Sequence, residues 1–160
     1  ARYAAAHDLA ARAREQAHRL RGDMLALAAR DATAFQGFTR ALALPNGTPE
    51  ERELRGRARA EALLDGAGVQ LELLGLLVQI AELGLEIAAR GLAGAVGDAV
   101  TAVFLAAGAA RSACWAVRSN LREAGDAAAG RPDLAVAETS LARVEDVERR
   151  VRELLEERLG

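Results

Sequence analysis

One carboxylate, Asp98, stands where the sequence passes from one apolar stretch to the next. It follows the glycine-rich run from Gly91 to Gly97 and opens the apolar segment that ends near Leu121. An acid at a helix start can be a cap that accepts backbone N–H bonds, which lowers its pKa, or a general acid/base tuned by desolvation. The residues alone leave both interpretations open, and Asp98 is the first candidate for catalysis.

The other side chains capable of metal or nucleophilic chemistry do not form a set. His7 and His18 are eleven residues apart, which places them about 16 Å apart along a helix, too far to share a metal ion. Cys114 is the single cysteine, so it forms no intrachain disulfide, and as a nucleophile it would need a neighbouring histidine. The sequence favours a buried thiol, no metal and no cofactor.

Two stripes of polar side chains have a structural and a functional interpretation. The first contains Glu72, Gln79, Glu82 and Glu86 at helical spacing. It is either a solvent-facing seam or the polar lining of a cleft. The second contains Arg111, Arg118 and Arg122 on the same face as Trp115. It is either ion-paired and solvated or a site for an anionic ligand.

These side chains must be positioned by helices, because apolar residues recur every three or four positions through most of the chain. A first helix is expected from Arg2 to about Leu44. At about 60 Å it would exceed the width of a compact domain, so we expect a bend or break near Arg30 and Asp31. Thr48-Pro49-Glu50-Glu51 has the pattern of a capping box and opens the next helix after a turn.

Further helices are expected over Pro49–Leu64, Val69–Ala89 and Asp98–Glu123, with a last one starting at Pro132. Asp65-Gly66-Ala67-Gly68 is either a break or a place where two helices cross closely. No strand pattern is present. The sequence therefore predicts an all-α fold, an antiparallel bundle of about five helices, in a single domain over residues 1–160.

Composition excludes several classes of function. The formal net charge is −2, which gives no basic field for nucleic acid. The twenty residues from Gly91 to Ala110 carry one charge, but they are rich in glycine and place Asp98 where hydrocarbon would penalise it. The charged start lacks the apolar core of a signal peptide. We expect a cytoplasmic protein that binds neither nucleic acid nor membrane.

Several motifs occur in a distinctive order. Asp31-Ala32-Thr33-Ala34-Phe35 and Leu44-Pro45-Asn46-Gly47-Thr48-Pro49-Glu50-Glu51 are followed by Gly91, Asp98 and Val117-Arg118-Ser119-Asn120-Leu121. In this order they resemble the cyclodeaminase/cyclohydrolase family, which includes the cyclodeaminase half of formimidoyltransferase-cyclodeaminase and bacterial methenyltetrahydrofolate cyclohydrolases. The resemblance extends from about Tyr3 to Asp126.

The resemblance implies a helical bundle, usually a homodimer, that handles one-carbon units on a folate-like substrate. Such enzymes expel ammonia from the formimino derivative of tetrahydrofolate, or open and close its methenyl bridge with water, without a metal or prosthetic group. Asp98 would then move the proton. Asn120 would orient the pterin or the bridge, and Asp31 and Arg118 complete the ligand-binding candidates.

The chain departs from the family pattern at positions that matter for this chemistry. Leu92 and Gly97 occupy an asparagine and a serine position of the family's corner, Ala116 occupies an asparagine position, and Gln70 replaces a proline. The glycine-rich helix that precedes the position of Tyr3 in the family has no counterpart in this sequence. Two alternatives therefore stand beside the folate enzyme: a divergent enzyme acting on another small molecule, and a non-catalytic helical dimer.

Overall fold

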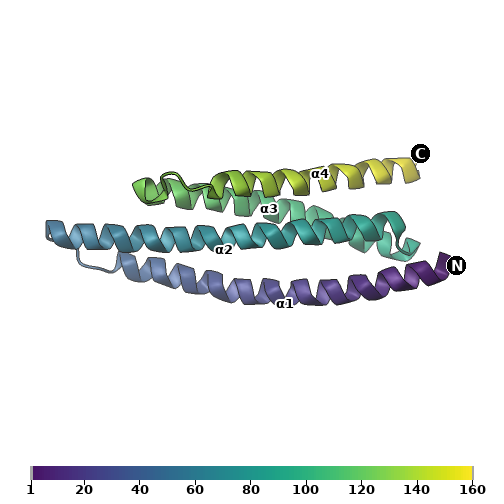
Figure 1. Cartoon of the computed structure of the whole chain (residues 1–160), viewed down its shortest axis with the longest axis horizontal. Helices are drawn as coiled ribbons and strands as arrows, with labels where there is room; N and C mark the ends of the chain where they lie inside the picture. Colours follow the sequence, from purple (N-terminus) through teal and green to yellow (C-terminus); the bar gives the residue numbers. More distant parts are fainter. Residues whose placement is uncertain (1, 160) are drawn as a thin grey trace.

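The computed structural model describes residues 2–159, and their side chains from residue 7 to residue 158. Over this range it contains four α-helices and no strand, which confirms the all-α prediction (Figure 1). The helices are α1 (Arg2–Leu42), α2 (Pro49–Arg90), α3 (Val96–Ala124) and α4 (Asp133–Leu159). Short 3-10 turns, η1 (Ala93–Ala95) and η2 (Gly125–Ala128), lie before and after α3. The expected count of about five helices was too high by one.

Helices α1 and α2 form an antiparallel hairpin in which each contains more than forty residues. The predicted capping box is confirmed, since the hydroxyl of Thr48 accepts from the N–H of Glu51 at 3.1 Å while the carboxylate of Glu51 accepts from the N–H of Thr48 at 3.0 Å. Of the expected bend or break near Arg30 and Asp31, no break occurs: α1 is one gently bowed helix, which α2 supports along its length (Figure 1). The prediction assumed a compact domain, whereas the molecule is elongated.

The expected second and third helices are one helix, because Asp65–Gly68 does not interrupt α2. Of the two interpretations of that segment, a close crossing is the one observed. A Cβ atom at Gly66 would lie 3.0 Å from the Nδ2 atom of Asn120 on α3. At Gly84 it would lie 2.6 Å from the Cγ2 atom of Val103. Glycine within α2 therefore lets α3 approach at two points, at a cost in helix propensity of about 1 kcal/mol each.

The glycine corner returns the chain along α2. A side chain at Gly91 would collide with the carbonyl oxygen of Ile87, at 2.5 Å, so the glycine allows the chain to leave α2. Helix α3 begins at Val96, two residues before the expected start at Asp98. The core lies between α2, α3 and α4, and its largest fully buried side chains are Leu74, Val103, Val117, Val144 and Val151.

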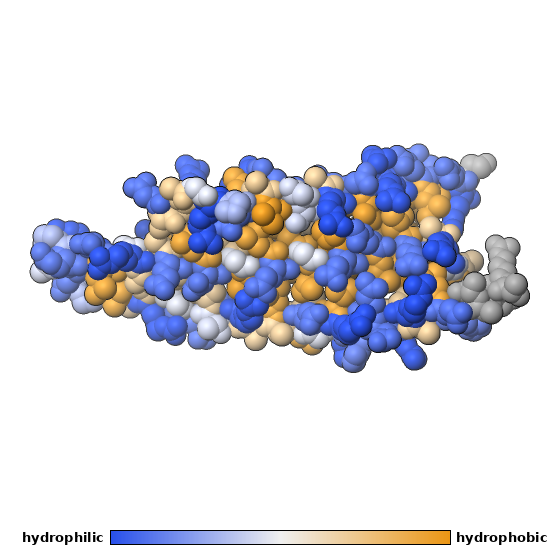
Figure 2. All heavy atoms as spheres, viewed as in Figure 1, coloured by the Kyte–Doolittle hydropathy of each residue, from blue (hydrophilic) through white to orange (hydrophobic). Residues whose placement is uncertain are grey.

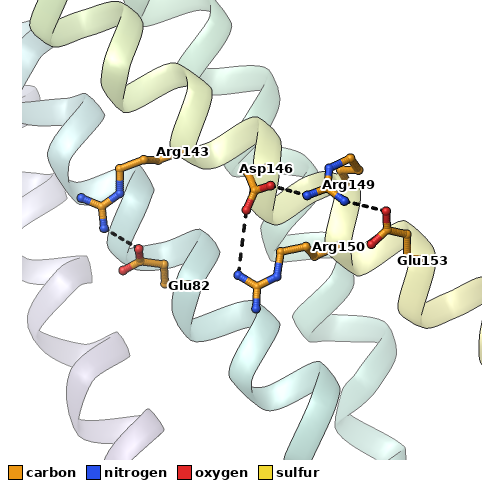
Figure 3. Close-up of polar contacts among 6 residues, drawn as sticks. All are labelled: Glu82, Arg143, Asp146, Arg149, Arg150 and Glu153. Carbon is orange, nitrogen blue, oxygen red and sulfur yellow. Dashed lines mark hydrogen bonds and ion pairs between the residues drawn. The ribbon is translucent and has the colours of Figure 1, made fainter.

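Within residues 2–159, helix α1 packs against α2 alone, which leaves a groove on each side of it. The groove between α1 and α4 is charged: Arg30 and Arg12 on α1 pair with Glu72 and Glu86 on α2, and Arg143 on α4 pairs with Glu82 at 2.6 Å (Figure 3). Figure 2 looks onto this face and shows hydrophilic side chains along α1 and α4. The glutamate stripe is therefore mainly a seam of ion pairs, and at its Glu72 end it also lines a pocket of about 530 Å³ together with Arg30, Arg40 and Arg131.

The groove on the other side, between α1 and α3 with α2 as its floor, is here called the apolar groove. Its rims carry Phe35 of α1 and Leu105 and Trp115 of α3, all of which are about two-thirds exposed. By length and hydropathy, the stretch Ala93–Ala128 could also cross a membrane, a test that core helices of globular proteins pass as well. In this structure α3 buries one side against α2 and α4 and leaves its other side on the apolar groove.

Candidate functional site

A pocket of about 300 Å³ in the apolar groove brings together two of the predicted site residues, Asp31 and Asn120. It lies between the C-terminal half of α1, the N-terminal half of α2 and the C-terminal end of α3. We call it the polar-aromatic pocket. It is lined by Asp31, Ala34, Phe35, Phe38, Ala62, Leu63, Gly66, Gln70, Ala116, Asn120 and Glu123.

Hydrogen bonds hold three of the polar side chains of this pocket. The Nε2 atom of Gln70 donates to the Oδ1 atom of Asp31 at 3.0 Å. Glu123 accepts from the guanidinium of Arg59 at 3.0 Å. The amide of Asn120 lies against Gly66 on α2, which offers no Cβ to displace it. Asp31 and Asn120 therefore face one space from different helices, with acceptor and donor groups both present.

The pocket also contains candidate ligand-binding side chains that the sequence analysis did not select. Gln70 entered only as a departure from a family proline, Phe35 only as the end of the Asp31–Phe35 motif, and Phe38 was not singled out. Asp31 and Phe35 are four residues apart, so they lie on one face of α1. This spacing could have predicted that the phenyl ring and the carboxylate line the same site. No signal in the sequence indicated Gln70.

Phenyl rings beside carboxylate and amide groups suit a flat heteroaromatic ligand. Phe35 and Phe38 offer apolar surface for a ring to stack on. The carboxylate of Asp31 accepts hydrogen bonds, and the amides of Gln70 and Asn120 both donate and accept. A pocket that combines apolar walls with a few convergent polar groups is the usual design of a small-molecule site.

Asp98 lies in a different pocket, further along the same groove. This second pocket, here the Asp98 pocket, has a volume of about 500 Å³ and is otherwise apolar apart from Arg21. Its lining residues are Ala17, Leu20, Arg21, Met24, Ile80, Leu83, Gly84, Ile87, Ala95, Asp98, Ala99 and Ala102. Asp98 is exposed, so its carboxylate is accessible to a ligand in this pocket.

The interpretation of Asp98 as a helix cap is wrong. The residue in the N-cap position of α3 is Ala95, and no side chain accepts a capping hydrogen bond there. Asp98 is the third residue of α3, where its negative charge is favourable beside the helix N-terminus. Because no backbone N–H group occupies its oxygens as a cap would, the carboxylate can accept hydrogen bonds from a ligand.

The structure does not bring Asp98 together with Asn120 and Asp31 in one chain. Asp98 and Asn120 are twenty-two residues apart on α3, which corresponds to about 33 Å and about six turns. A whole number of turns places both side chains on the same side of the helix, facing the apolar groove. One small ligand cannot touch both within a single chain.

Arg118 points toward α4. Its guanidinium donates to Glu138 at 2.8 Å, and Arg111 donates to Glu145 at 3.0 Å and to Glu148 at 2.6 Å. Two members of the arginine stripe are thus ion-paired across the α3–α4 contact. Arg118 lines neither of the two pockets described above. Its role as a ligand-binding residue stays a prediction.

The histidines and the cysteine lie away from both pockets. His7 and His18 are exposed, and no group of three His, Cys, Asp or Glu side chains within residues 7–158 is arranged to hold a metal ion. Cys114 is buried against the core, and this burial raises the pKa of its thiol. A thiol in that environment is a poor nucleophile at neutral pH.

Comparison with known proteins agrees with this architecture. The family model for formiminotransferase-cyclodeaminase matches residues 1–132. No curated protein matches the chain. Among solved structures, a formiminotetrahydrofolate cyclodeaminase from Thermotoga maritima superposes with a TM-score of 0.73 at 22% identity, covering 89% of this chain and 67% of the other. That likeness shows the shared fold, and the family match covers more than half of the sequence. The chain belongs to the formiminotransferase-cyclodeaminase family.

Proposed function

We propose that this protein acts on a one-carbon-substituted tetrahydrofolate, as a cyclohydrolase or a cyclodeaminase. The observation that carries the proposal is the convergence of Asp31, Gln70 and Asn120 beside Phe35 and Phe38 in one pocket. A pterin is a flat ring with an amino group, ring N–H groups and a carbonyl, so it matches the donors, acceptors and stacking surface of that pocket.

The polar-aromatic pocket would bind and orient the folate. Asn120 would hold the pterin or the one-carbon bridge, with Asp31 fixed by its hydrogen bond from Gln70. Holding the folate rigidly allows its own N10 atom to reach the bridge carbon, which replaces an encounter in solution by an intramolecular step. No metal or prosthetic group takes part in this proposal, and the protein would act as a cytoplasmic homodimer.

Asp98 would move the proton in the homodimer, where it would come from the other copy than the Asn120 of the same site, since the two residues lie about 33 Å apart within one chain. In the cyclohydrolase reaction, water adds to the methenyl carbon and a carbon–nitrogen bond opens, so a base accepts a proton from water and the same group returns one to the departing nitrogen. In the cyclodeaminase reaction, N10 bonds to the formimino carbon, and the acid protonates the amino nitrogen on that carbon, whose bond to carbon then breaks so that it leaves as ammonia. Asp98 suits either step because its carboxylate opens into a pocket of about 500 Å³ whose lining is mainly apolar.

One observation favours a divergent enzyme as the second candidate. Ala116 lines the polar-aromatic pocket at a position where the resemblance leads us to expect an asparagine. The methyl group removes one hydrogen-bonding partner next to Asn120, so the ligand could be a different heteroaromatic small molecule. Restoring the amide with Ala116→Asn should improve folate binding if the substrate is a folate and leave it unchanged if it is not.

The test is the absorbance of methenyltetrahydrofolate with and without the protein, together with release of ammonia from formiminotetrahydrofolate. We expect acceleration of one of these reactions, a loss of at least about 100-fold in Asp98→Asn because general acid/base groups contribute that much, and a raised KM in Asn120→Ala. Asp23→Asn is the matched control, since Asp23 is an exposed acid on α1 that lines neither pocket.

Binding is measured separately by thermal shift with tetrahydrofolate derivatives. A ligand at a hundred times its dissociation constant stabilises the fold by about 2.7 kcal/mol. We expect that shift for the wild type and for Asp98→Asn, and a smaller one for Asn120→Ala. No shift with any folate, combined with no acceleration of either reaction, would remove the folate proposal.

A further inference from the structure

We propose that the protein binds a phosphate monoester that also carries hydroxyl groups, such as a sugar phosphate or a nucleotide, on the charged side of the α1–α2 hairpin. The site is the pocket of about 530 Å³ at the Glu72 end of the glutamate stripe, here called the arginine pocket. It shares only Ala34 with the polar-aromatic pocket, which opens on the other side of α1. The inference goes beyond the proposed function and does not depend on it.

Three guanidinium groups line the arginine pocket. Arg30 and Arg40 lie on α1, where with Thr33 and Gly37 they form one stripe at i, i+3, i+7 and i+10. Arg131 comes from the loop between η2 and α4. Arginine binds phosphate oxygens through pairs of parallel hydrogen bonds, so a pocket with three arginines suits a phosphate group.

Two of these arginines are held in place and still have N–H groups to offer. Arg30 donates from both of its terminal nitrogens to Glu72, in one case at 2.6 Å. Arg131 donates from its Nε atom to Asp133. A guanidinium has five N–H groups, so each keeps donors that these bonds do not use. The carboxylates fix the two side chains before a ligand arrives, which lowers the cost of binding.

Arg40 has no such partner. It takes part in none of the ion pairs found within residues 7–158. Its Nη2 atom would lie 4.0 Å from a Cβ atom placed on Gly37, so its guanidinium folds back along α1 over that glycine. On α2, a Cβ atom at Gly68 would meet nothing within 4 Å, although Gly68 lines the same pocket. The two glycines therefore leave space beside a guanidinium that no carboxylate occupies.

A carboxylate without a partner faces the same space. Asp65 on α2 lines the arginine pocket and forms no ion pair or side-chain hydrogen bond within the part of the chain whose side chains are described. The pair between Arg30 and Glu72 sets the antiparallel register of α1 and α2. In that register Asp65 lies opposite Gly37, over which Arg40 folds. A cation and an anion that stay apart in one pocket suit a ligand with an acceptor for one and a donor for the other.

A phosphate monoester of a hydroxylated compound meets both requirements. Its phosphate carries a charge of about −1.5 to −2 near neutral pH and has three acceptor oxygens for the guanidinium groups. Its hydroxyl groups can donate to the carboxylate of Asp65. The pocket volume of about 530 Å³ lies within the usual range for small-molecule sites. Inorganic phosphate has no group suited to Asp65, so we expect it to bind more weakly than the ester.

Calorimetric titration of the wild-type chain at low ionic strength tests the ligand class. The probes are ribose 5-phosphate, adenosine monophosphate, inorganic phosphate and ribose. Ribose 5-phosphate should bind at least about 10-fold more tightly than inorganic phosphate, since a hydrogen bond to a charged group contributes that much, and ribose should not bind. Tighter binding of adenosine monophosphate than of ribose 5-phosphate would identify a nucleotide as the ligand, and the reverse order a sugar phosphate.

Backbone NMR locates the ligand, because a different glycine lines each pocket. Ribose 5-phosphate should shift the amide signals of Gly37 and Gly68. The signal of Gly66, two residues from Gly68 but in the polar-aromatic pocket, should stay in place. So should that of Gly84 in the Asp98 pocket. Shifts at Gly66 or Gly84 in place of Gly68 would overturn the assignment of the arginine pocket.

Variants test the two unpaired groups separately. Arg40→Gln should weaken binding of ribose 5-phosphate by at least about 10-fold, whereas Arg14→Gln, which changes another exposed and unpaired arginine of α1, should not. Asp65→Ala should remove most of the preference for ribose 5-phosphate over inorganic phosphate, and Asp23→Ala should retain it. Gly68→Leu should abolish binding by filling the pocket. All five positions lie outside the buried core, so the variants should remain folded.

Three results would overturn the proposal. Absence of binding by every phosphate compound at millimolar concentration would remove the site. An equal loss in Arg40→Gln and Arg14→Gln would mean diffuse attraction to surface charge. Tighter binding of glycine, a zwitterion, than of ribose 5-phosphate would contradict the ligand class. Because none of these measurements contains a folate, their outcome and that of the folate assays are independent of each other.

Discussion

Gly66 and Asn120 lie against each other where α2 meets the C-terminal half of α3, and a Cβ atom at position 66 would lie 3.0 Å from the Nδ2 atom of Asn120. We predict that Gly66→Ala separates stability from binding. Alanine favours the helix by about 1 kcal/mol, and the amide can turn away at little cost, so the free energy of unfolding should be unchanged or higher. Folate affinity should fall, because the displaced amide no longer faces the pocket.

The measurements are urea unfolding and a thermal shift with a tetrahydrofolate derivative. Gly68→Ala is the matched control, because a Cβ atom two residues further along α2 meets nothing within 4 Å. It should gain the same helix stability and keep full folate binding. Equal binding by both variants would show that the position of Asn120 does not matter for the ligand.

A second prediction concerns Glu148, which is only 7% exposed and joins α4 to α3. It accepts hydrogen bonds from Arg152 and Arg111 at 2.6 Å each, and these hold the pKa of its carboxyl below the usual range. Glu148→Gln should lower the free energy of unfolding at neutral pH by about 1.5–3 kcal/mol, the range for hydrogen bonds to charged groups. Glu153→Gln, which removes an exposed pair with Arg149, should cost less than about 0.5 kcal/mol.

The lowered pKa of Glu148 also predicts how the stability of the protein changes with pH. A carboxyl whose pKa is lowered on folding stabilises the native state above its unfolded pKa of about 4.3, and this contribution is lost as the pH falls through the lower native value. The stability of the wild type should therefore fall more steeply in acid than that of Glu148→Gln. Thermal unfolding from pH 7 down to pH 3 measures the difference. Parallel curves would mean that Glu148 titrates alike in both states.

Features set by neighbouring residues could be predicted from the sequence. The continuity of a helix that is stabilised by packing against another helix could not. The cap at Thr48 and the glycine corner at Gly91 depend on neighbouring residues, so both could be located in advance. Neither a break near Arg30 nor one at Asp65–Gly68 is observed, and the second segment is instead the close helix crossing that was its other interpretation. Whether a helix survives a charged or glycine-rich turn depends on the helix packed beside it, which no local pattern records.

The candidate site was likewise predicted only in part, because motifs identify residues but not their neighbours in space. Asp31 and Asn120 were both selected from motifs, and the fold brings them into one pocket, but their partner Gln70 was read only as a missing proline. The separation of Asp98 from that pocket follows from α3 being straight and unbroken over six turns. A sequence motif orders residues along the chain and does not tell whether two of them face each other or lie at opposite ends of one helix.

A third prediction concerns Cys114. The thiol is buried, and burial raises its pKa, so both access and thiolate content are low in the native protein. Iodoacetamide at pH 7.5 should alkylate the native protein at least about 100-fold more slowly than the urea-unfolded chain, if opening costs several kcal/mol. Mass spectrometry over time measures both rates. Fast alkylation of the native protein would mean that α3 separates readily from the core.

A last prediction uses two glycines of α2 that differ only in what faces them. A Cβ atom at Gly84 would lie 2.6 Å from the Cγ2 atom of fully buried Val103 and 3.0 Å from the carbonyl oxygen of Ala99, and the backbone oxygen cannot move aside without shifting α3. Overpacking costs about 1–3 kcal/mol, against about 1 kcal/mol gained in helix propensity, so Gly84→Ala should be destabilising. At Gly75 a Cβ atom meets nothing within 4 Å, and Gly75→Ala should stabilise by up to about 1 kcal/mol.

Thermal unfolding resolves these two changes, since 1 kcal/mol shifts Tm by about 2–4 °C in a domain of this size. Gly84→Ala should lower Tm and Gly75→Ala should raise it. The compensating variant Gly84→Ala with Val103→Ala tests the cause, because removing the Cγ2 atom relieves the closer contact while leaving a small cavity. If α2 and α3 touch as described, the effects of the two substitutions should not add, and the double variant should be more stable than their sum. Strict additivity would mean that the helices do not meet at Gly84.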